Sequence, residues 1–96
     1  LEANPLEIEI DFPQPVDLHK ITTLVGSPAT RFTIIIEQPG NGQPLSFTET
    51  VSSSDQIRPI TIDFGSSYQV SRFMISIENI NEPVPTHVHL WELILE

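Results

Sequence analysis

The residues of this sequence that could do chemistry are polar side chains set between short hydrophobic runs. His87 and His89 are two residues apart, so on an extended strand both imidazoles lie on the same face. Such a pair can supply two ligands of a zinc site, with His19 or a carboxylate as a third. The alternative, which we favour, is that both histidines lie on a partly solvated edge strand.

The carboxylates show no pattern typical of catalysis. Glu7, Glu9 and Asp11 alternate with hydrophobic residues, which indicates the solvent face of a strand. A glycosidase needs two carboxyl groups placed across a cleft. The sequence also contains no Gly-x-Ser-x-Gly, His-Glu-x-x-His or phosphate-loop motif. We therefore predict that the protein is not an enzyme and has no catalytic residue.

Strands have to position these polar side chains, because hydrophobic residues recur with a period of two and helical periodicity is absent. One alternating motif occurs twice: Ile8–Phe12 reads I-E-I-D-F, and Ile60–Phe64, 52 residues later, reads I-T-I-D-F. We expect seven strands, marked by hydrophobic residues in the ranges 6–12, 18–25, 32–36, 45–51, 60–64, 70–77 and 87–95. Seven short strands with Pro, Gly, Ser and Asn between them predict an all-β antiparallel sandwich or jelly roll.

A slip in the alternation follows each copy of the motif. Leu18 and Ile21 are three residues apart, as are Val70 and Phe73, yet all four are hydrophobic. A β-bulge that absorbs one extra residue would let both members of each pair face the core. We expect these bulges at residues 19–20 and 71–72, with the basic side chains there closing over them or pairing with Asp63 and Asp11.

Length, charge and composition exclude several classes of protein. The 96 residues form one domain, 1–96, and the first residue is Leu, so we expect a piece of a larger protein. Thirteen acidic and four basic residues give a net charge of −9, which disfavours nucleic acid and anionic membranes as partners. The longest hydrophobic run, Ile34–Ile36, is far too short to span a bilayer. The sequence has no cysteine for a disulfide.

Alternate connections of an antiparallel fold share one end, so residues 1–5, 26–30, 52–56 and 79–86 should meet. The polar side chains gathered there would be Asn4, Thr30, Asp55, Asn79, Asn81, Glu82 and His87. Such hydrogen-bonding groups suit a sugar, whose C–H faces usually also pack on an aromatic ring. We take Asp55, Asn79, Asn81, Glu82 and His87 as candidate ligand-binding residues. A plain solvated end is the alternative.

Three segments resemble the discoidin, or coagulation factor 5/8 type C, superfamily, whose fold is the galactose-binding-like jelly roll. Ile8–Phe12 with Leu18–Ile21 is similar to its "I-x-I-D-L-G" and "I-x-x-V" strands. Val70–Ile75 is similar to its "sRyiRI" strand, and Leu90–Leu95 to its "L-x-E-L-x-x" closing strand. The resemblance covers residues 6–95. It implies an extracellular or cell-surface location. It also implies that the end where the alternate connections meet corresponds to the family's binding end.

The resemblance also bears on metal and membrane binding. It implies a structural calcium held by Glu92 and an N-terminal segment, of which only Leu1–Pro5 stands before the first strand here. The alternative is that Glu92 pairs with a base or faces solvent. The loops at Gly26–Thr30 and Ser52–Gln56 carry no aromatic residue, so we expect no membrane insertion.

The sequence thus predicts a non-catalytic accessory module. One hypothesis is a carbohydrate-binding or adhesion module whose partner is a glycan. The second is a structural or protein-interaction domain that packs against neighbouring domains of a larger extracytoplasmic or membrane-associated enzyme and binds no small ligand. A third, weaker hypothesis is a fragment of an enzyme.

Overall fold

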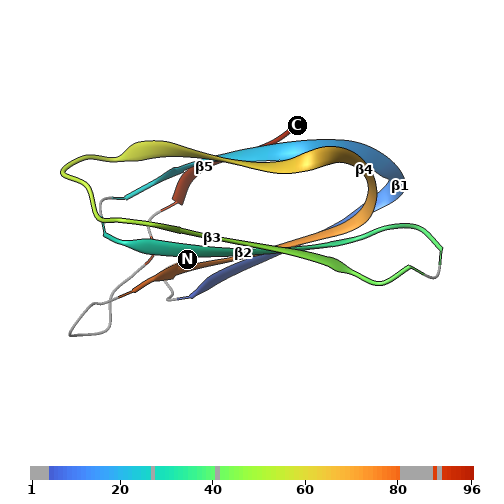
Figure 1. Ribbon diagram of the computed structural model, residues 1–96, viewed down its shortest axis with the longest axis horizontal. Coiled ribbons are helices and arrows are strands. Elements are labelled where there is room, and N and C mark those ends of the chain that lie inside the picture. The colour runs from blue at the N-terminus through green and yellow to red at the C-terminus, as the bar shows by residue number, and fades with distance from the viewer. Residues whose placement is uncertain (1–4, 27, 41, 81–87, 89) are drawn as a thin grey trace.

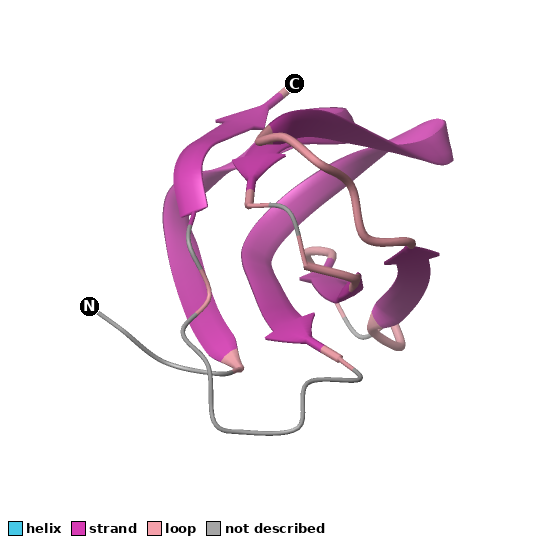
Figure 2. Ribbon diagram, turned by 90° about the vertical axis from the view of Figure 1, so that its left-hand side faces the viewer, coloured by secondary structure: helices cyan, strands magenta, loops and turns pink. Residues whose placement is uncertain are grey.

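The structure is a computed structural model that describes residues 5–26, 28–40, 42–80, 88 and 90–96, with the backbone alone for residue 91. It contains five strands within these residues: β1 (Leu6–Val25), β2 (Thr30–Glu37), β3 (Leu45–Val51), β4 (Arg58–Asn79) and β5 (Leu90–Leu95). All five belong to one sheet of order β3-β2-β4-β1-β5, and every pairing is antiparallel. Figure 2 shows only strands and loops in the described part of the chain. The prediction of an all-β antiparallel fold is confirmed, while the jelly-roll topology stays a prediction.

Two of the expected strand breaks are bends within longer strands. The ranges 6–12 and 18–25 are continuous in β1, and the ranges 60–64 and 70–77 are continuous in β4. Asp11 pairs with Arg72 and Val16 with Val70, so the four residues 12–15, including two prolines, lie opposite Ser71 alone. Proline is tolerated at such irregularities, because no ladder hydrogen bond is required of it there.

These bends fold the sheet back on itself. Figure 1 shows β1 and β4 curving together at the right-hand end, so that the two halves of the sheet face each other. One half contains β3, β2, the end of β4 and the start of β1, and the other contains the start of β4, the end of β1 and β5. The side chains between the halves form the core. Its buried hydrophobic members are Leu18, Ile21, Val25, Phe32, Ile34, Ile36, Ile62, Phe64, Val70, Phe73, Ile75, Ile77 and Val88.

The repeated motif corresponds to a symmetric pairing of β1 with β4. Asp11 lies opposite Arg72, and Lys20 lies opposite Asp63. Because Asp63 follows Asp11 by 52 residues and Arg72 follows Lys20 by 52, the two copies exchange places across the pair. The two irregularities are exchanged in the same way: residues 12–15 oppose residue 71, and residues 64–67 oppose residue 19.

The bulge expected at residues 19–20 is present. The backbone N–H groups of His19 and Lys20 both donate to the carbonyl oxygen of Glu96, at 2.7 and 3.0 Å. Two residues facing one acceptor define a bulge, and it lets both Leu18 and Ile21 point into the core. At the other irregularity, where Ser71 lies opposite residues 12–15, the Ser71 hydroxyl donates to the Glu37 carbonyl at 3.0 Å. The described residues include no helix that is long and apolar enough to cross a membrane.

Candidate functional site

One end of the molecule is organised by Arg58, the first residue of β4. Its guanidinium donates hydrogen bonds to the carbonyl oxygens of Gly26 at 2.6 Å, Ser52 at 2.7 Å and Pro28 at 3.3 Å. The first and third of these acceptors belong to the β1–β2 connection, and Ser52 belongs to the β3–β4 connection. A single planar cation with several fixed donors can hold carbonyl groups from two loops at once.

Further hydrogen bonds tie this end together. The Thr30 hydroxyl donates to the Pro28 carbonyl at 2.8 Å, and the Ile80 backbone N–H donates to the Ala29 carbonyl at 3.0 Å. Residues 26, 28–30, 52–53 and 79–80 therefore lie together, at the left-hand end of Figure 1, as the alternation of strands predicts. We call this region the loop end.

The loop end contains a hollow of about 310 Å³. Hydroxyl groups and small apolar side chains line it: Ala29, Thr50, Val51, Ser52, Ser53 and Ile80. No aromatic or charged residue is among these lining residues. The hollow can therefore accept a neutral, hydroxyl-bearing ligand through hydrogen bonds, but within the described residues it offers no flat ring for a sugar face.

The structure brings only part of the expected binding set to this region. Asn79 is the last residue of β4, pairs with Thr30 and is 8% exposed. Asp55 is exposed on the β3–β4 connection and does not line the hollow. Asn81, Glu82 and His87 lie outside the described residues. The binding role of these five residues stays a prediction.

The metal candidates are dispersed in the part of the chain that the structure describes. Glu92 is exposed on β5, where its backbone pairs with Leu24. His19 is exposed at its bulge, and His87 and His89 are outside the described residues. Among the described residues no group of three or more His, Cys, Asp or Glu side chains is placed to hold a metal ion. The calcium site at Glu92 stays a prediction.

Arg58 is the residue that sequence reasoning missed. Its role depends on carbonyl groups 6, 30 and 32 positions away in the chain. The available signal was its position: it is a basic residue two positions after the polar loop 52–56, at the start of the next strand.

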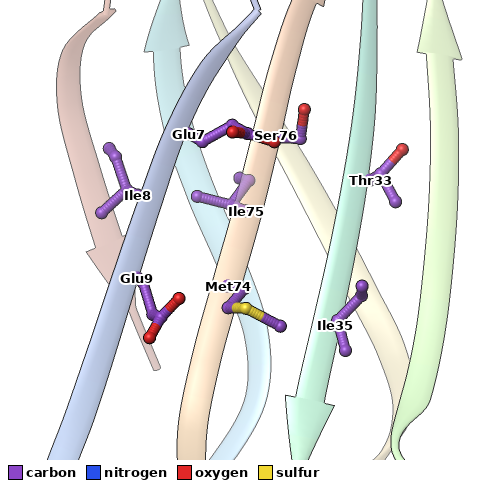
Figure 3. Close-up of a pocket in the computed structure, with 8 residues that line it drawn as sticks. All are labelled: Glu7, Ile8, Glu9, Thr33, Ile35, Met74, Ile75 and Ser76. Atoms are coloured by element: carbon purple, nitrogen blue, oxygen red, sulfur yellow. The ribbon is translucent and has the colours of Figure 1, made fainter.

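A second hollow lies on the outer, solvent-facing side of the sheet. This groove, of about 300 Å³, crosses β1, β4 and β2, and Figure 3 shows its lining residues. They are Glu7, Ile8, Glu9, Thr33, Ile35, Met74, Ile75 and Ser76. Sequence reasoning assigned Glu7 and Glu9 to a solvent face, which is correct, but could not place them beside residues of β2 and β4.

Arg72 lies at one end of this groove, in a cluster of carboxylates. Its Nε donates to Asp11 Oδ1 at 2.7 Å, Nη2 lies 3.2 Å from Glu9 Oε1, and Nη1 lies 3.7 Å from Glu37 Oε2. The hydrogen bond to Asp11 and the charges of the three carboxylates raise the pKa of Arg72 above its ordinary value. Arg72 thus pairs with Asp11, one of the two aspartates that the sequence offered as partners for the basic side chains, whereas the ion pair of Lys20 is with Glu96, at 3.3 Å.

Comparison with known protein families and with curated proteins finds no match to the sequence. Among solved structures, the chain is similar to chitosan-binding module 1 of a chitosanase/glucanase from Paenibacillus sp. IK-5. The TM-score is 0.63 at 14% sequence identity, over 98% of this chain and 72% of the other. Identity this low shows a shared fold and no more, and the discoidin resemblance stays a prediction. The chain therefore has the fold of a small all-β module.

Proposed function

We propose that this domain is a non-catalytic carbohydrate-binding module, an extracellular accessory of a larger protein, and that it binds glycans at the loop end. The observation that carries the proposal is the set of three hydrogen bonds from Arg58 to the carbonyl oxygens of Gly26, Pro28 and Ser52, which we call the Arg58 latch. These bonds fix two connections around a hydroxyl-lined hollow. A binding site gains affinity when its loops are held in place before the ligand arrives.

The fold supports the same function. The structural neighbour is a chitosan-binding module, and its binding function is a reason to test this chain with sugars. Thr50, Ser52 and Ser53 contribute hydroxyl groups that both donate and accept, which matches the chemistry of sugar hydroxyls. Because no aromatic ring is among the described lining residues, we expect weak binding, with Kd of about 1 mM.

The test is an NMR titration of the isotope-labelled domain with mono- and oligosaccharides, with and without calcium. Saturable shifts of the backbone amides of residues 29–30, 50–53 and 79–80 are expected. Ser53→Arg, which fills the hollow, should abolish them, whereas Ser66→Arg, at an exposed serine in the β4 bend, should not. If none of the sugars shifts a resonance of the folded domain, sugar binding is rejected and the alternative, an interaction domain without a small ligand, is favoured. A calcium requirement would support the role of Glu92, which Glu92→Gln would then remove.

A further inference from the structure

We infer that the groove across β1, β4 and β2 is a second binding face, which takes a cationic amino-sugar chain. This site lies on the outer side of the sheet, and the inference does not depend on binding at the loop end. It concerns a different ligand charge and a different set of residues.

The groove consists of two neighbouring rungs of the sheet, each rung being a row of residues paired across β1, β4 and β2. In one rung Glu9 of β1, Met74 of β4 and Ile35 of β2 lie side by side. In the other rung Glu7, Ser76 and Thr33 lie side by side in the same order of strands. Each rung therefore runs from a carboxylate on β1 to a neutral residue on β2. Figure 3 shows Met74 on the middle strand with its side chain extending toward Ile35 on β2, and Glu7 reaching toward Ser76.

The residues that line the groove include no basic side chain to neutralise the negative charges of Glu7 and Glu9. Glu9 shares Arg72 with two other carboxylates, Asp11 and Glu37. Glu7 is exposed and forms no ion pair among the described residues. The whole chain carries a net charge of −9. A cationic ligand therefore gains both local and long-range attraction at this face.

The remaining lining residues favour a sugar over other cations. The half-buried Met74 and Ile35 offer an apolar floor for the C–H faces of pyranose rings, and Thr33 and Ser76 offer hydroxyl groups. A lysine-rich peptide that binds by strand addition needs an open sheet edge. Here β4 and β2 are paired on both sides, whereas the start of β1 is paired only with β4 among the described residues. A lysine oligomer is therefore the control for strand addition at that edge.

The internal repeat shows that the fold does not require these carboxylates. At 52 residues after Glu7 and Glu9 stand Pro59 and Thr61, which occupy the symmetric positions on the other half of the sheet. That half forms the same strand pairing without acidic residues at these positions. The pairing of β1 with β4 therefore does not account for the two glutamates.

The experiment is an NMR titration with a glucosamine oligomer at mildly acidic pH, where its amines are protonated. The controls are the fully N-acetylated oligomer of equal length, which is uncharged, and a lysine oligomer of equal charge. We expect saturable shifts at the amides of Glu7, Glu9, Thr33 and Met74 with the amine form alone. Binding should weaken as salt is added, because screening acts on exposed charges.

Two matched variants test the carboxylate. Glu7→Gln should weaken groove binding about threefold, the value of an exposed ion pair. Glu49→Gln removes an equal charge from an exposed position on β3 and should leave Kd unchanged. Equal shifts with the acetylated oligomer, equal binding of the lysine oligomer, or unchanged Kd in Glu7→Gln would each overturn the inference. Shifts confined to residues 50–53 would also overturn it while supporting the loop-end site, whereas shifts in the groove alone would do the reverse.

Discussion

Removal of the Arg58 latch should destabilise the domain and loosen the loop end selectively. Arg58→Met keeps much of the aliphatic stem but deletes three hydrogen bonds from a charged donor. A bond from a charged group contributes about 1.5–3 kcal/mol when buried. Two of these bonds are part-buried, the one to Ser52 is exposed, and the 3.3 Å contact is long. Discounted for this exposure, the total loss is about 2 kcal/mol.

A loss of this size leaves the domain folded and measurable. A chain of 96 residues has a free energy of unfolding of about 5–14 kcal/mol. Urea denaturation should show the free energy of unfolding falling by about 2 kcal/mol with the m-value unchanged, and Tm falling by roughly 10 °C. Arg58→Lys retains a point charge that can reach fewer carbonyl groups, so its loss should be about half as large, or about 1 kcal/mol.

The matched control is Arg31→Met on β2. Arg31 is exposed and forms one ion pair, with Glu78 at 3.2 Å, so its loss should be about 0.5 kcal/mol or less. In Arg58→Met, amide shifts should concentrate at residues 26, 29–30 and 52–53. If Arg58→Met is no more destabilised than Arg31→Met, or if its shifts are spread over the sheet, the latch does not organise the loop end.

Three further stability measurements check other parts of the fold. Gly65 has φ of 84° with open space around it, so Gly65→Ala should cost about 1–2 kcal/mol from backbone strain alone, whereas Gly42→Ala should be near neutral. The Thr23 hydroxyl is fully buried without a hydrogen-bond partner among the described residues, so Thr23→Val should raise the free energy of unfolding by about 1 kcal/mol; a lower value would mean that the hydroxyl is satisfied. Phe73 is 0% exposed, so Phe73→Ala should cost about 3–5 kcal/mol, and a loss below 1 kcal/mol would mean that the core is wrongly placed.

The alternation of hydrophobic residues was enough to predict the fold class and most of the core. Ile34 and Ile36, and likewise Ile75 and Ile77, are buried because side chains two residues apart share one face of a strand. The three-residue spacing of Leu18 and Ile21 was enough to place the bulge at residues 19–20. The breaks at residues 13–15 and 65–69 were interpreted wrongly as strand ends, because a local signal cannot distinguish a strand that stops from one that bends.

The candidate sites could be predicted only in part. Alternation of strand direction predicted that residues 26–30 and 52–56 share an end, but not that Arg58 holds them there. The groove needs residues 7–9, 33–35 and 74–76 in adjacent strands, and its rungs depend on register. A shift of one residue in that register would send every side chain to the opposite face.

The sequence by itself determined what each short segment does: its strand periodicity, its buried face, its bulge and its internal repeat. These properties depend on neighbours a few residues apart in the chain, so they can be read locally. The tertiary structure alone decided that the two copies of the repeat pair with each other and that the sheet folds back through β1 and β4. It also decided that Arg58 reaches the carbonyl groups of the loop end and, separately, that residues of three strands line the groove. Apart from the hydrogen bond of Arg58 to Ser52, these contacts join residues about 30 to 70 positions apart, and they are set by the packing of the whole core rather than by any local preference.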